Sequence, residues 1–124
     1  MVDLVNDAEL RNEEILWRRI SPDQLRIEAD GEPRCSDGAF RTAEMSVHIA
    51  SRTSLEQILQ NYPHHSVVAF SAGFVRSIEC IVASDPDDPA HALVCRKDDP
   101  TKRLTGSQVN KIAQEAQFVV VRRP

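Results

Sequence analysis

Residues 36–50, SDGAFRTAEMSVHIA, and the later His91 hold the polar side chains that are most able to do chemistry. The guanidinium of Arg41 can bind a carboxylate or a phosphate through paired hydrogen bonds. The imidazole of His91, which opens an apolar run after an acidic loop, can exchange a proton near neutral pH. We therefore predict Arg41 and His91 as a catalytic pair, and Arg18, Arg41 and Glu44 as ligand-binding residues.

A structural role is the alternative for each member of this pair. Arg41 stands where a loop joins a strand, and it could cap that loop or pair with Glu44. His91 could bind the carboxylates of Asp87 or Asp88 and so tie the acidic loop to the strand that follows. Alanine variants of the pair would separate the two interpretations, since a structural residue affects stability and a catalytic one affects activity.

His48 belongs to a polar row with Glu44 and Ser46, each two residues from the next. Side chains two residues apart on a strand share a face but lie roughly 7 Å apart. That separation is too large for a direct hydrogen-bonded relay. We therefore assign His48 to a solvent-exposed face of the sheet.

Hydrophobic periodicity predicts the elements that must position these residues. Six strands are expected, at Glu14–Ile20, Glu44–Ala50, His65–Ser71, Ile78–Ala83, His91–Arg96 and Phe118–Val121. Capping boxes at Thr53–Glu56 and Thr105–Gln108 predict two helices, one ending before Pro63 and one at Ala116. The last strand is apolar throughout, which is typical of a strand in the interior of a sheet.

The remaining segments complete the expected fold. Ser21–Gln24 predicts a helical turn, Asp30–Gly38 a loop, and Ala72–Ser77 either a helical turn or a continued strand. Three strands follow one another between the helices, which argues against a regular β-α-β array. We predict a single α+β domain over residues 14–124 after a flexible or short helical arm at residues 1–13. Its mixed or mostly antiparallel sheet would have about five to six strands, with two main helices packed on it.

Composition limits the class of protein. The 124 residues carry a net charge of −4, which disfavours general nucleic-acid binding. No apolar run approaches the ~18 residues of a membrane span, and the acidic N-terminus is unlike a signal peptide. Three cysteines without a CxxC motif favour a reducing compartment, so we expect a cytoplasmic protein. Glycine-rich phosphate loops and zinc motifs are absent, so we expect no cofactor and no metal.

Four segments carry a resemblance to other proteins: WRR at 17–19, GAFR at 38–41, MSV at 45–47 and PAHA at 89–92. Together they resemble a set of small uncharacterised bacterial proteins, a likeness that covers most of the chain and implies no particular activity. A shorter similarity joins Arg18 on the first strand to the loop that contains Gly38. That pair is similar to the start of RES-type ADP-ribosyltransferase-like domains, whose downstream acidic residue has no match in this chain.

Two functions are compatible with these features. The first, which we predict, is a small cytosolic bacterial module that binds a protein partner or forms a homo-oligomer, such as a component of a defence or toxin–antitoxin system. The alternative is a compact enzyme for a nucleotide or a similar anionic small molecule, with Arg41 binding the anion and His91 as acid/base. Convergence of Arg41, Glu44 and His91 at one pocket would favour the enzyme over the module, and their scatter across the sheet would rule out this enzyme.

Overall fold

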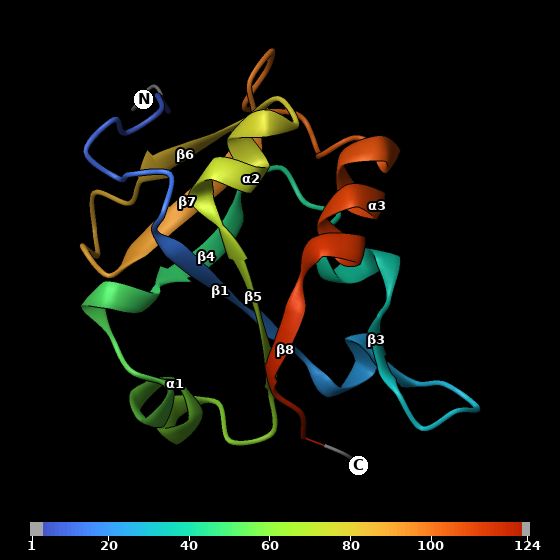
Figure 1. Cartoon of the computed structure of the whole chain (residues 1–124). Coiled ribbons are helices and arrows are strands. Elements are labelled where there is room, and N and C mark those ends of the chain that lie inside the picture. Colours follow the sequence, from blue (N-terminus) through green and yellow to red (C-terminus); the bar gives the residue numbers. More distant parts are fainter. Residues whose placement is uncertain (1–3, 123–124) are drawn as a thin grey trace.

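The computed structural model describes residues 4–122, which form a six-stranded sheet flanked by helices (Figure 1). The strand order is β6-β7-β4-β1-β5-β8, and every neighbouring pair is antiparallel. The strands are β1 (Ile15–Ile20), β4 (Met45–Ile49), β5 (Ser66–Ser71), β6 (Cys80–Ser84), β7 (His91–Arg96) and β8 (Gln117–Val120). A separate antiparallel pair consists of β2 (Leu25–Ile27) and β3 (Pro33–Cys35).

Three helices complete this single α+β domain: α1 (Leu55–Asn61), α2 (Ala72–Ser77) and α3 (Gly106–Glu115). Single turns of 3-10 helix occupy Pro22–Gln24, Asp37–Ala39 and Ala50–Arg52. The predicted fold class is confirmed, and of the two sheet types that we allowed, the antiparallel one is present. None of the helices within residues 4–122 has the length and apolar character to cross a membrane.

The main core lies on one face of the sheet, beneath α2 and α3. Residues directly opposite in an antiparallel pair point to the same face, so Leu16 of β1 shares this face with its partners Ile49 and Phe70. Val75 of α2 and Ile112 of α3 pack on it, and all five side chains are at most 3% exposed. The alternation of apolar and polar residues along the strands predicts this apolar face.

The opposite face of the sheet carries a row of three ring side chains from neighbouring strands. Trp17 on β1 pairs with His48 on β4, and His48 pairs with His91 on β7, so the three side chains point the same way. Helix α1 contributes to this second face, where its buried Ile58 lines a cavity together with both histidines. In Figure 1, α1 lies apart from α2 and α3. Helices α2 and α3 therefore pack on one face of the sheet, and α1 contributes to the other through the cavity.

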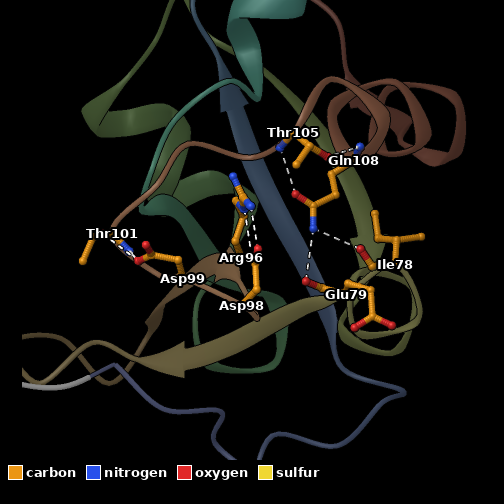
Figure 2. Close-up of polar contacts among 8 residues, drawn as sticks. All are labelled: Ile78, Glu79, Arg96, Asp98, Asp99, Thr101, Thr105 and Gln108. Atoms are coloured by element: carbon orange, nitrogen blue, oxygen red, sulfur yellow. Dashed lines mark hydrogen bonds and ion pairs between the residues drawn. The ribbon is translucent and has the colours of Figure 1, made fainter.

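Gln108 fixes the start of α3 against the turn between α2 and β6 (Figure 2). Its Oε1 accepts a hydrogen bond from the backbone of Thr105 at 2.9 Å, which completes the predicted capping box. Its Nε2 donates to the carbonyls of Ile78 and Glu79, each at 3.1 Å. Glu79 has a φ of 67°, in the left-handed region that non-glycine residues rarely adopt. The buried amide thus holds a tight turn in place from the first turn of α3.

The N-terminal segment is packed against the domain, unlike the flexible or helical arm that we expected at residues 1–13. Leu10 is 1% exposed and belongs to the core, and Asn6 forms a β-bridge with Ala83 at the outer edge of β6. The guanidinium of Arg76 donates to the side chains of Asn6 and Asn12 at 3.0 and 2.8 Å. An irregular segment has no hydrophobic period, so the sequence gives no sign of this docking. Residues 1–3 lie outside the described part of the chain.

The expectation that the last strand lies inside the sheet is wrong. β8 is an edge strand with alternating exposure, and Val119 is 43% exposed. The sheet register shifts between Val67 and Val68 of β5, which leaves Val119 without a direct partner there. A run of valines indicates a strand in the interior of a sheet only when another strand pairs with its outer edge, and no strand in residues 4–122 pairs with the outer edge of β8.

Two local predictions also change. Part of the expected loop at Asp30–Gly38 is strand β3, which is too short to show a period. The ambiguous segment Ala72–Ser77 is helix α2, whose N-cap Ser71 accepts a hydrogen bond from the backbone of Phe74.

Candidate functional site

His48 and His91 are in direct contact on the face of the sheet opposite the main core. They are opposite each other in the β4–β7 register, with ring centroids 4.5 Å apart and ring planes at 76°. His48 is 8% exposed, so its assignment to a solvent-exposed face is wrong. Strand periodicity predicted the face that His48 occupies, but the ring is not open to solvent there because it packs against His91 and Arg19.

His91 is held by the acidic loop that precedes it. Its Nδ1 lies 3.4 Å from Oδ2 of Asp88 and 3.9 Å from Oδ2 of Asp85. The other carboxylate oxygen of Asp88 accepts a hydrogen bond from the backbone of Ala90 at 2.9 Å, which shapes the loop. A carboxylate beside Nδ1 orients an imidazole ring, so Nε2 is the nitrogen of His91 that is left to contact a ligand.

His48 is held from the other side by Arg19 of β1. Nε of Arg19 donates to Nε2 of His48 at 3.1 Å, and its guanidinium carbon lies 3.7 Å from the centre of the Tyr62 ring. Burial, followed by the nearby charges of His91 and Arg19, lowers the pKa of His48 to about 4. His48 is therefore neutral near pH 7.

A cavity of about 270 Å³ lies between α1 and the two histidines, and we call it the histidine cavity. This volume is just below the range of about 300–1,000 Å³ that is typical of ligand sites, which limits an occupant to a single small molecule. In addition to the histidines, its walls carry one guanidinium, one carboxylate, two amides and two hydroxyls. The lining residues are His48, Arg52, Thr53, Gln57, Ile58, Asn61, Tyr62, Asp88, Ala90 and His91.

Arg41 and Glu44 lie at the other end of β4 from the histidine cavity, and both are exposed. Thr42, next to Arg41, accepts a backbone hydrogen bond from Leu104 just before α3. Four residues of extended chain separate Glu44 from His48, a span of roughly 13 Å. The structure therefore does not bring Arg41 and Glu44 together with His91. This scatter rules out the enzyme site that we predict from the sequence, so an enzyme would need other residues beside His91.

Arg18 points to the main core face, away from the histidine cavity. Its Nε donates to the carbonyl of Ala39 at 3.2 Å and its Nη1 to the carbonyl of Ser46 at 2.8 Å. Burial, with a smaller effect of Arg19, lowers the pKa of Arg18 to about 10. Its side chain joins β1 to β4 and to the turn at Asp37–Ala39, which is a structural role.

A second cavity, of about 420 Å³, lies beside the start of α3, and Arg96, Gln108 and Lys111 are among the residues that line it. It is larger than the histidine cavity, but its polar groups are mostly paired within the protein. Arg96 forms two hydrogen bonds to Asp98, at 2.9 and 2.6 Å, and Gln108 is bound at both ends of its amide. Because chemistry needs groups that can engage a ligand, the histidine cavity is the better candidate site.

Metal and thiol chemistry have no evident site in the described chain. No group of three or more His, Cys, Asp or Glu residues within residues 4–122 is placed to hold a metal ion. The three cysteines are free, and burial raises the pKa of Cys35 and Cys95 to about 11 and that of Cys80 to about 12. Such thiols are poor nucleophiles near pH 7.

Comparisons of the chain with protein-family models, with curated proteins and with solved structures found no match. The resemblances carried by the WRR, GAFR, MSV and PAHA segments therefore stay predictions. The histidine cavity itself is the basis for a functional proposal.

Proposed function

We propose that this protein is a compact acid–base enzyme that acts on a nucleotide or a similar anionic small molecule in the histidine cavity. The observation that carries the proposal is the contact of His91 with His48 on one side and Asp88 on the other, at the wall of a cavity. General acid–base catalysis requires an imidazole or a similar group that is held in position next to a ligand, and here a carboxylate holds the imidazole at the wall of a cavity.

In this proposal His91 is the residue that moves a proton. Its Nε2 takes a proton from the ligand or from water, the imidazolium is stabilised by Asp88, and the same nitrogen returns the proton to the product. Arg52, which lines the cavity, takes the anion-binding role that we had expected of Arg41. Gln57 and Asn61 of α1 supply donors and acceptors for the rest of the ligand.

The proposal is tested with AMP, CMP, GMP and UMP as probes. Nitrogen NMR of the full chain follows binding at the histidine side chains, and phosphorus NMR follows conversion of each nucleotide. We expect His91→Ala to lower the conversion rate by at least about a hundredfold, the low end of the usual effect of a general acid or base. His64→Ala is the matched control, since His64 is an exposed histidine that does not line the cavity, and it should keep the wild-type rate.

Binding without conversion of any of the four nucleotides would reduce the function to ligand binding. If none binds at millimolar concentration, or if His91→Ala converts a nucleotide as fast as the wild type, the proposed enzyme is wrong.

A module that binds a protein partner or a second copy is the alternative proposal. It is supported by the outer edge of β8, where Val119 is exposed and no other described strand pairs. The outer edge of β6, by contrast, is covered by Asn6, whose side chain also accepts a hydrogen bond from the backbone of Val82. The irregular register at Val119 and the four-residue length of β8 weaken this support, because both features limit strand pairing.

Self-association through β8 is tested by light scattering over a concentration series. If copies pair through this edge, the wild type should show a dimer that Val119→Lys dissociates, because a charge on an edge strand opposes pairing. Val5→Lys, at another exposed valine, is the control and should leave the dimer intact. A monomer at all concentrations would exclude the homo-oligomer.

For either function we propose the bacterial cytoplasm as the location. The support is the set of three free thiols, which persist in a reducing compartment.

A further inference from the structure

The two imidazoles of the histidine cavity have partners of opposite kind. Nε2 of His48 faces Nε of Arg19 at 3.1 Å, whereas Nδ1 of His91 faces the carboxylate of Asp88 at 3.4 Å. An arginine guanidinium is a donor and never an acceptor. Nε2 of His48 must therefore be the acceptor, and the single proton of the neutral ring must be on Nδ1.

Arg19 is itself held in place, so this arrangement is a fixed one. It lies two residues from Trp17 on β1, and Trp17 is the direct partner of His48, so Arg19 and His48 share a face. The ring of Tyr62, at the end of α1, packs against the guanidinium at 3.7 Å. Strand and helix together aim the donor of Arg19 at His48.

The charges around His48 keep it neutral. Arg19, Arg18 and His91 all disfavour a proton on the ring, and the carboxylate of Asp88 is the group that favours one. Burial is the largest cause, ahead of these charges, since the side chain is 8% exposed. His48 is thus poorly suited to exchange a proton near pH 7, although it touches the residue that we propose for this task.

Nδ1 of His48 is available to the cavity. The ring lines the cavity, and its Nε2 is taken by Arg19, which does not. Nδ1 of His48 makes no hydrogen bond among the described residues. If it were fully buried, it would be a buried nitrogen without a partner, but within residues 4–122 the one such side-chain atom is Nδ1 of His65. Nδ1 of His48 is therefore not sealed in the interior.

We infer that His48 is the fixed neutral donor of the histidine cavity, which gives its Nδ1 proton in a hydrogen bond to an anionic oxygen of the ligand, and that Arg19 is the positioning residue that sets this tautomer. The ligand part of the inference rests on the proposed function, whereas the tautomer does not. The two histidines then have separate roles: His48 holds an oxygen and His91 moves a proton. The ligand class is an oxyanion, with the phosphate of a mononucleotide as the test case.

The tautomer is measured first, in the free protein. Long-range proton–nitrogen correlation spectra of the nitrogen-labelled chain distinguish Nδ1–H from Nε2–H for each histidine. We expect His48 to show the neutral Nδ1–H pattern between about pH 5 and 8. Arg19→Met, which keeps the stem and removes the donor, should shift His48 toward Nε2–H, and Arg19→Lys should restore Nδ1–H. Arg52→Met is the matched control, because Arg52 lines the cavity but donates to the carbonyl of Pro89, and it should leave the pattern unchanged.

An Nε2–H or doubly protonated His48 in the wild type overturns the inference. So does an unchanged Nδ1–H pattern in Arg19→Met, because Arg19 would then not set the tautomer. Thermal unfolding of each variant shows whether it is folded, and the restoration by Arg19→Lys separates positioning from a general loss of structure.

AMP is then added to the wild type and to the Arg19 variants. We expect the Nδ1 proton of His48 to shift and to exchange more slowly with water, and Arg19→Met to weaken AMP binding about tenfold. If AMP binds and the Nδ1 proton is unaffected, the donor role is wrong while the proposed function stands. If none of the four nucleotides binds, the proposed function and the donor role both fail. The spectra of the free protein would still establish the Nδ1–H tautomer of His48 and its dependence on Arg19.

Discussion

Replacing Arg18 by alanine is expected to lower the free energy of unfolding by about 3 kcal/mol. The change removes the donors for the carbonyls of Ala39 and Ser46, and Ala39 is fully buried. A hydrogen bond from a charged donor is worth about 1.5–3 kcal/mol, and a buried carbonyl without a partner costs about 1–3 kcal/mol. Denaturant unfolding monitored by circular dichroism measures the loss.

The control for Arg18 is Arg26→Ala, in the exposed part of β2, which should change stability by at most about 0.5 kcal/mol. Arg18→Lys should recover part of the loss, because one ammonium can reach only part of what the guanidinium donates to. A fully stable Arg18→Ala that no longer binds nucleotide would contradict the structural role and return Arg18 to the ligand-binding residues predicted from the sequence.

Acidification is expected to destabilise the protein by about 2–3 kcal/mol through His48 alone. The folded state holds the pKa of His48 at about 4, below the ordinary 6.5, so the unfolded state binds the proton more readily. The stability that His48 provides is complete above about pH 6.5 and is lost as the pH falls toward 4. His65, whose pKa burial and Arg19 also lower, adds a loss of the same sign.

Unfolding free energies measured at several pH values for the wild type and for His48→Gln isolate this contribution. Glutamine does not titrate, so the variant should lose less stability than the wild type over the same interval, whatever its stability at pH 7. His64→Gln is the matched control, since it removes an exposed histidine, and it should follow the wild-type curve. Parallel curves for the wild type and His48→Gln would show that His48 takes up its proton without a penalty.

The fold class could be predicted because most of the main elements carry a strong local pattern. Met45, Val47 and Ile49 alternate with polar residues, and the structure places them on the core face of β4. The capping box at Thr105 and Gln108 marks the start of α3. The position of β8 could not be predicted, because which strand lies at an edge depends on pairings between distant segments.

Only part of the candidate site could be predicted, again because contacts between distant segments do not show in one sequence. His91 was found from its place after an acidic loop, and its carboxylate partners are Asp88 and Asp85, where we had expected Asp87 or Asp88. His48 was missed because its contact with His91 comes from strand register, which one sequence does not reveal. Arg52 has no motif, and it reaches the cavity because the turn at Ala50–Arg52 leads into α1.

The docked N-terminal segment has a consequence for the order of folding. Asn6 accepts hydrogen bonds from Arg76 and from the backbone of Val82, which are 70 and 76 residues away. Contacts between segments so distant in the chain form only after a long loop has closed, which is slow. The segment around Asn6 is therefore among the last to find its place, and the outer edge of β6 stays open until it does.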